Sequence, residues 1–186
     1  MQCGSGGQAR RLGPAHSARM DAAPVWDGRP DAAFVQAGAS QRDARVAGLG
    51  LRWNFALPAA PAGWGGAIEV TAGRWSTRVT PGGVPRAGRE QTLHLVAMPV
   101  LRWRLQGDGA SWFMEAGAGL SWHERPYRVE RKRQGSRLNF QEELGLGHAW
   151  AGGQELSLRL AHMSNADLRK PNPGETWWSL RWAYAF

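Results

Sequence analysis

Two side chains capable of acyl-transfer chemistry close a segment in which leucines recur at every second position. Leu156, Leu158 and Leu160 share one parity, and His162 and Ser164 continue it. Residues two apart on a β-strand share a face, with Cα atoms about 6.5–7 Å apart. Over that distance an imidazole reaches a serine hydroxyl, as a base does when it activates a nucleophile. If this face meets lipid, the pair suits a lipid ester; the alternative is a polar pair at a membrane interface.

The same period of two is clearest at the end of the chain. Trp178, Leu180, Trp182, Tyr184 and Phe186 share one parity, and small or polar residues take the other. A helix needs apolar residues three and four positions apart, whereas this alternation predicts a strand with two unlike faces.

Seven further segments alternate in the same way, near 33–41, 44–55, 64–76, 91–105, 111–123, 138–150 and 154–164. Pro99 lies inside one of them and predicts a bulge, because proline removes a ladder donor. Eight strands of about ten residues predict an all-β fold, an eight-stranded antiparallel transmembrane β-barrel of outer-membrane type. Its Trp- and Leu-rich face meets lipid, and small and charged residues fill the interior. The alternative is a soluble eight-stranded barrel whose apolar face lines the inside.

The composition agrees with a single folded domain. Of the 186 residues, 42% are apolar and 11 are Trp, which excludes a disordered chain. Cys3 is the only cysteine, so a disulfide framework within one chain and a thiolate metal cage are excluded. No apolar run approaches the roughly 18–20 residues of a membrane helix. The mean hydropathy of −0.45 still permits a membrane barrel, because alternating strands average to a polar score.

Residues 1–31 have no periodicity and are rich in Gly, Ala, Arg, Pro and Asp. We expect them to be disordered and residues 32–186 to form the barrel. A secretory signal needs an apolar stretch of about 7–15 residues, and none is recognisable here. The interpretation that follows is a non-native or misassigned start ahead of the mature domain.

The site segment also carries a recognisable pattern. His162–Ala166 reads HMSNA and Pro171–Gly174 reads PNPG. Together they resemble the HxSNA…PNPG signature of the lipid A 3-O-deacylase family, the PagL-type outer-membrane enzymes. Segments 138–147 and 113–119, with their glycine patterns, look like the sixth and fifth strands of that family. The resemblance covers residues 91–186 well and the first three strands in outline.

This resemblance implies an eight-stranded barrel with a lipid-facing Ser-His-acid triad that removes the ester-linked acyl chain at position 3 of lipid A. It implies no metal and no cofactor. By position, Ser164 is the nucleophile and His162 the general base. The oxyanion site falls on Asn165 and on the backbone N–H groups of Ala166 and Asp167, and Asn172 braces the loop.

The acid is where the chain departs from the family, which places a Glu two residues after the Gly of the PNPG turn. Thr176 stands at that position, and Glu175 comes one residue earlier. Glu175 is the first candidate, provided that the loop absorbs the one-residue slip, which otherwise reverses the face. Glu142 is the second, because a turn at 151–153 pairing Trp150 with Gln154 sets Glu142 opposite His162.

Asp167 is a second departure, since the family usually has a small residue there and a carboxylate opposes a developing negative charge. The other histidines are interpreted as structural. His94 and His123 have interior parity, and His148 lies at the periplasmic end. None of them has the spacing of a metal site.

The connections alternate in length. Short ones near 58–63, 106–110 and 151–153 indicate periplasmic turns, and longer ones at 77–90, 124–137 and 165–175 indicate extracellular loops. Segment 124–137 has six basic and two acidic residues, within a chain of net charge +8. Arginine forks suit the phosphates of lipopolysaccharide in the outer leaflet. No nucleic-acid-binding motif accompanies the charge.

Two function classes therefore remain from the sequence. The first is an esterase that acts on lipid A within the outer membrane. The second is a non-catalytic small barrel with a structural or adhesive role. A carboxylate within hydrogen-bond reach of His162 favours the esterase, and its absence favours the non-catalytic barrel. A homodimer is also compatible with the sequence.

Overall fold

The computed structural model describes residues 28–78, 88–105, 111–129 and 132–186. Eight long strands are β1 (Ala32–Ser40), β2 (Arg45–Phe55), β3 (Trp64–Arg78), β4 (Arg89–Arg104), β5 (Ser111–His123), β8 (Leu138–Ala149), β9 (Gln154–Ser164) and β10 (Glu175–Ala185). A separate two-stranded sheet consists of β6 (Arg128–Val129) and β7 (Lys132–Arg133). The sequence pattern did not predict this small hairpin, which lies within the loop predicted at 124–137.

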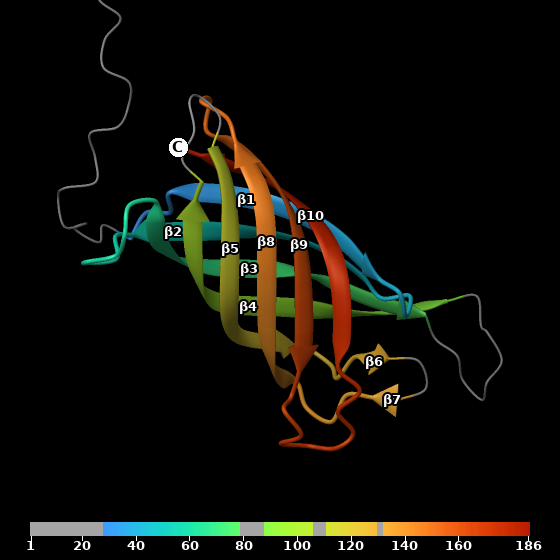
Figure 1. Ribbon diagram of the computed structural model, residues 1–186. Coiled ribbons are helices and arrows are strands. Elements are labelled where there is room, and N and C mark those ends of the chain that lie inside the picture. The colour runs from blue at the N-terminus through green and yellow to red at the C-terminus, as the bar shows by residue number, and fades with distance from the viewer. Residues whose placement is uncertain (1–27, 79–87, 106–110, 130–131) are drawn as a thin grey trace, which may run out of the picture.

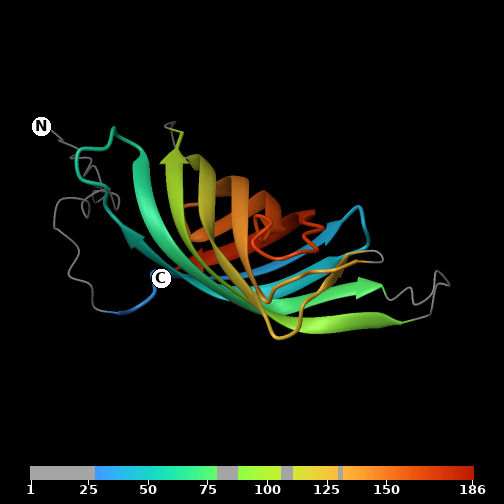
Figure 2. The same cartoon turned by 90° about the horizontal axis from the view of Figure 1, so that it is seen from below.

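The eight long strands form one closed antiparallel barrel. Each pairs with the next along the chain, and β1 pairs with β10 to close the sheet (Figures 1 and 2). Closure leaves no unpaired sheet edge. The predicted fold, an eight-stranded barrel of outer-membrane type, is confirmed.

The alternation sorts side chains as predicted. Leucines and tryptophans stand on the outside; Leu49, Leu144 and Leu180, for example, are 63%, 61% and 55% exposed. A soluble barrel with an apolar lining is the opposite arrangement. The apolar surface therefore faces outward, and the polar residues must satisfy one another inside.

The interior is held by a charge network. It joins Arg52, Arg102, Arg159 and Arg181 to Glu69, Glu115, Glu143 and Glu155. Representative distances are 2.9 Å for Arg52–Glu155 and 2.6 Å for Arg181–Glu69. Buried charges persist only when they are paired and hydrogen-bonded, and each of these eight groups has at least one oppositely charged partner in the network.

Toward the long-loop end, the filling of the barrel changes from charged to aromatic. Trp75 packs against Trp177 and Tyr127 with ring centroids 5.0 and 5.2 Å apart. The His94 and His123 rings stack at 4.5 Å beside Trp75. Both histidines are buried inside, in agreement with their predicted parity. Among the described residues, no group of three or more His, Cys, Asp or Glu side chains forms a metal site.

Two further expectations from the sequence concern Pro99 and the N-terminal segment. The bulge expected at Pro99 is wrong, because β4 keeps one register with β5 before and after it, Ala97 with Leu120 and Val100 with Gly117. The missing donor interrupts the ladder locally without inserting a residue. The expectation for residues 1–31 concerns mainly residues 1–27, which lie outside the described residues; β1 begins at Ala32. In the described part of the chain, no helix is long and apolar enough to span a membrane.

Candidate active site

Ser164 and His162 lie together on the outward face of β9, where the strand enters its loop to β10. His162 is exposed and Ser164 is half-buried, whereas Met163 between them is buried inside the barrel. Leu158 continues the same outward face and is exposed. A substrate therefore reaches this pair from outside the barrel and not through the filled interior.

The His162 ring is held from β10. Its Nδ1 lies 2.8 Å from Oγ1 of Thr176, the residue directly opposite in the β9–β10 register. A Cβ atom on Gly174 would lie 3.3 Å from Cε1 and 3.6 Å from Nε2 of the ring. The Cε1–Nε2 edge of the ring therefore faces Gly174, the residue before β10. With Nδ1–H donating to Thr176, the Nε2 lone pair is free to accept a proton.

Glu142 flanks His162 on the other side. The β8–β9 register sets Glu142 directly opposite His162, as the turn at 151–153 predicted. Both side chains are on the outward face and exposed. Directly opposed residues of an antiparallel pair have Cβ atoms about 4.5–5.5 Å apart. In the described part of the chain the His162 ring hydrogen-bonds Thr176, and no hydrogen bond or ion pair joins it to the Glu142 carboxylate.

Glu175 lies on the opposite face of the sheet. It is 1% exposed, pairs with Met163, and its Oε1 accepts the Thr176 backbone N–H at 3.3 Å. Regular pairing of β10 begins at Glu175 itself, so the loop does not absorb the one-residue offset. A strand has a strict period of two, so Thr176 and Glu142 flank His162 on the outward face, with Thr176 in hydrogen-bond contact, and Glu175 lies on the inward face.

The chain reverses in a tight turn immediately after Ser164. The Leu168 N–H donates to the Asn165 carbonyl at 3.0 Å, and Ala166 and Asp167 between them have φ values of 51° and 60°. Left-handed backbone costs about 1–2 kcal/mol at a residue with a side chain. Within the described residues, no acceptor is recorded for the Ala166 and Asp167 N–H groups. The strained turn thus presents two exposed backbone donors beside the serine.

Asn165 anchors that turn from below. Its side chain is buried, and Nδ2 donates to the Arg169 carbonyl at 2.6 Å and to Ser136 Oγ at 3.0 Å. Its backbone N–H donates to Asn172 Oδ1 at 3.0 Å. The Asn165 side-chain amide is thus committed to the loop, and Asn172 Oδ1 accepts hydrogen bonds from the Asn165 backbone and from Gln134.

Sequence reasoning missed Gln134, which completes this buried amide cluster. Gln134 Nε2 donates to Asn139 Oδ1 at 2.8 Å and to Asn172 Oδ1 at 3.2 Å. Gln134 stands in a charged stretch that reads as a solvated loop, so its pattern gave no signal. Asn139 did carry one, since it belongs to the segment that resembles the sixth strand of the family.

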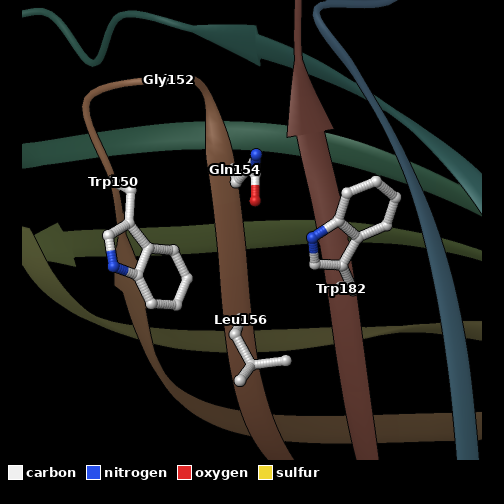
Figure 3. A pocket seen from close by; sticks show the side chains of 5 residues that line it. All are labelled: Trp150, Gly152, Gln154, Leu156 and Trp182. Carbon is white, nitrogen blue, oxygen red and sulfur yellow. The ribbon is translucent and has the colours of Figure 1, made fainter.

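The β8–β9 turn and the adjoining parts of β9 and β10 form a pocket at the short-turn end of the barrel, far from Ser164. Its volume is ≈ 360 Å³, and it is lined by Trp150, Gly152, Gln154, Leu156 and Trp182 (Figure 3). His162 lies six residues from Leu156 along β9. The pocket is therefore separate from the Ser164–His162 pair and is not the site of its chemistry.

Comparison with known proteins gives the family of this barrel. The family model described as Lipid A 3-O-deacylase (PagL) matches residues 47–185. The chain belongs to the lipid A 3-O-deacylase (PagL) family. The resemblance seen at His162–Ala166 and Pro171–Gly174 is confirmed, and membership places the chain among ester hydrolases.

The chain is also similar to individual members of the PagL family. The chain is 32% identical to Lipid A deacylase PagL of Pseudomonas aeruginosa over 145 residues, 77% of this chain and 79% of that protein. It is 33% identical to Lipid A deacylase PagL of Bordetella bronchiseptica over 90 residues, 48% of each chain. A crystal structure of the outer membrane enzyme PagL superposes with a TM-score of 0.68 and 27% identity, over 83% of this chain and 99% of that one.

The contact between Gly174 and the His162 ring predicts the effect of one added methyl group. Gly174→Ala places a Cβ 3.3 Å from Cε1 at a residue with φ 54°, so the ring must shift. We expect ester hydrolysis to fall about ten- to a hundredfold with the barrel still folded. Turnover of a soluble acyl ester in detergent, alongside heat-modifiable gel mobility, measures both.

Gly152→Ala is the matched control, since a Cβ there meets nothing within 4 Å. Wild-type turnover in Gly174→Ala would show that the position of this ring edge does not matter to the reaction.

Proposed function

We propose that this barrel is an outer-membrane esterase that removes the acyl chain ester-linked at position 3 of lipid A. The observation that carries the proposal is the placement of Ser164 and His162 on the outward, leucine-rich face of β9. Membership of the PagL family supports the substrate and the reaction. A serine–base pair on that face meets a substrate dissolved in the bilayer.

The distribution of side chains supports a membrane location. The outward apolar band and the polar interior are the arrangement of outer-membrane barrels, and the PagL structure that this chain resembles is that of an outer membrane enzyme. The long loops that follow β5 and β9 then face the cell exterior. This orientation sets Ser164 near the outer leaflet, where lipid A resides.

The reaction follows from the two side chains. His162 Nε2 takes the Ser164 hydroxyl proton as Oγ attacks the carbonyl carbon of the acyl ester. The tetrahedral intermediate collapses, the sugar oxygen leaves as an alcohol, and His162 returns the proton to it. Water then attacks the acyl-enzyme with His162 again as base, which releases the fatty acid and restores Ser164.

The strained turn supplies the oxyanion site. The N–H groups of Ala166 and Asp167 directly follow the serine and have no recorded acceptor, so they are free to donate to the developing negative oxygen. Asn165 holds this turn through its buried side chain. The Asp167 side chain is exposed, so water and ions screen its charge.

Two residues divide the role of the family's acid. Thr176 Oγ1 hydrogen-bonds His162 Nδ1 and so holds the ring orientation, and the reaction uses the tautomer in which Nδ1–H donates to this hydroxyl. Glu142, opposite His162 on β8, supplies the negative charge that stabilises the imidazolium. Glu175, the first candidate from the sequence, lies inside the barrel and takes no part in this arrangement.

The deacylase assignment predicts a mass change in lipid A. Expression of the barrel behind a functional export signal in a host with an outer membrane should remove one 3-hydroxyacyl mass from its lipid A. Ser164→Ala should abolish the change, because no other group on this face is an activated nucleophile. Mass spectrometry of extracted lipid A measures it. Unchanged lipid A with a folded, membrane-inserted wild type contradicts the proposal.

The assignment of the acid makes a separate prediction. Glu142→Gln keeps the shape of the side chain and removes its charge, so kcat should fall about a hundredfold. The matched variant Glu175→Gln changes a carboxylate on the inward face and should leave kcat close to wild type. Turnover of purified lipid A in detergent compares them. The reverse ranking would assign the acid role to Glu175.

A further inference from the structure

The β7–β8 connection and the β9–β10 loop, which follows Ser164, are in backbone contact. The Gly135 N–H donates to the Pro171 carbonyl at 2.8 Å. A Cβ on Gly135 would lie 2.8 Å from the carbonyl oxygens of both Arg169 and Lys170, so glycine lets the backbones touch. The β6–β7 hairpin and the β9–β10 loop lie at the same end of the barrel (Figure 1). We call residues 134–137 and 165–174 the loop junction.

The loop junction carries three exposed cations, Arg137, Arg169 and Lys170. The Arg169 carbonyl accepts a hydrogen bond from the Asn165 side chain, and Ser136, which precedes Arg137, accepts another. Asn165 in turn directly follows Ser164. The Asn165 side chain therefore ties Arg169 and Ser136, which neighbour Lys170 and Arg137, to the residue that follows Ser164.

These cations differ from most others at the long-loop end. Five arginines in the described part of the chain form ion pairs with three carboxylates 2.8–3.8 Å away. The pairs are Arg78 and Arg89 with Asp43, Arg128 and Arg133 with Glu90, and Arg125 with Glu124. Within the described residues, no ion pair is recorded for the three cations of the junction.

The charge of the junction is unbalanced. Asp167 is its one carboxylate, against the three cations, and Glu142 lies on the strand beside His162. Unpaired arginines favour anions with a planar array of oxygens, and lysine binds phosphate as a point charge. The fold thus holds an excess of positive charge next to the nucleophile.

We propose that Arg137, Arg169 and Lys170 bind a phosphate monoester on the sugar headgroup of the substrate and so hold its acyl ester over Ser164. The inference rests on the proposed deacylase function, in which ester and phosphate belong to one headgroup. Lipid A is a phosphorylated glucosamine lipid, so a phosphate anchored at the junction brings the neighbouring ester oxygen to the serine. The phosphate contact fixes position and takes no part in bond breaking.

The test compares phosphorylated lipid A with the same lipid after enzymatic dephosphorylation, in matched detergent micelles. The triple variant Arg137→Gln, Arg169→Gln and Lys170→Gln should raise KM for the phosphorylated lipid about tenfold or more. It should leave kcat unchanged, and it should leave both constants unchanged for the dephosphorylated lipid. Arg125→Gln is the matched control, since it removes one exposed charge already paired with Glu124.

Two results would overturn the phosphate site. An unchanged KM for phosphorylated lipid would show that the cations do not contact it. An equal rise in KM for both lipids would show an effect on the loops and not on phosphate recognition.

A binding arm separates this inference from the proposed function. In the Ser164→Ala background, binding of each lipid is followed by the intrinsic Trp fluorescence of the barrel. If wild type cleaves neither lipid, yet phosphorylated lipid binds more tightly and only when the three cations are present, the deacylase proposal fails and the phosphate site stands. Equal binding of both lipids overturns the phosphate site.

Discussion

In a closed β-barrel every strand side chain points either into the barrel or out of it, and the alternation along the strand determines which. Here the inward side chains include arginines and glutamates that pair with one another, and the outward side chains are largely leucine and tryptophan. The same rule fixes the chemistry. His162 and Ser164 face out while Met163 faces in, and Thr176 faces out while Glu175 faces in. A shift of one residue would exchange these sets.

The site is therefore assembled across strands and not along one of them. Thr176 of β10 and Glu142 of β8 stand directly opposite His162 in the register, and Thr176 hydrogen-bonds its ring. Ser164, the nucleophile that we propose, lies at the end of β9, followed by a turn in which Ala166 and Asp167 have positive φ. Buried amides from the β7–β8 connection hold that turn, so a loop distant in sequence determines where Ser164 stands.

The sequence predicted what alternation and local turns control. It predicted the eight long strands to within a few residues, the outward face of His162, and the register that sets Glu142 opposite it. It did not predict the inward position of Glu175, because that depends on where pairing resumes after the β9–β10 loop. Nor did it predict Gln134, whose role arises from a tertiary contact in a stretch that resembles a solvated loop.

The central claim is that the acid of this family member has moved from β10 to β8, with Thr176 at the vacated position. The double variant Glu142→Gln/Thr176→Glu tests it most directly by returning the carboxylate to β10. Its kcat on lipid A, measured beside Glu142→Gln alone, should recover about tenfold or more. If Thr176→Glu lowers kcat equally in both backgrounds, Glu142 is not the acid and the account is wrong.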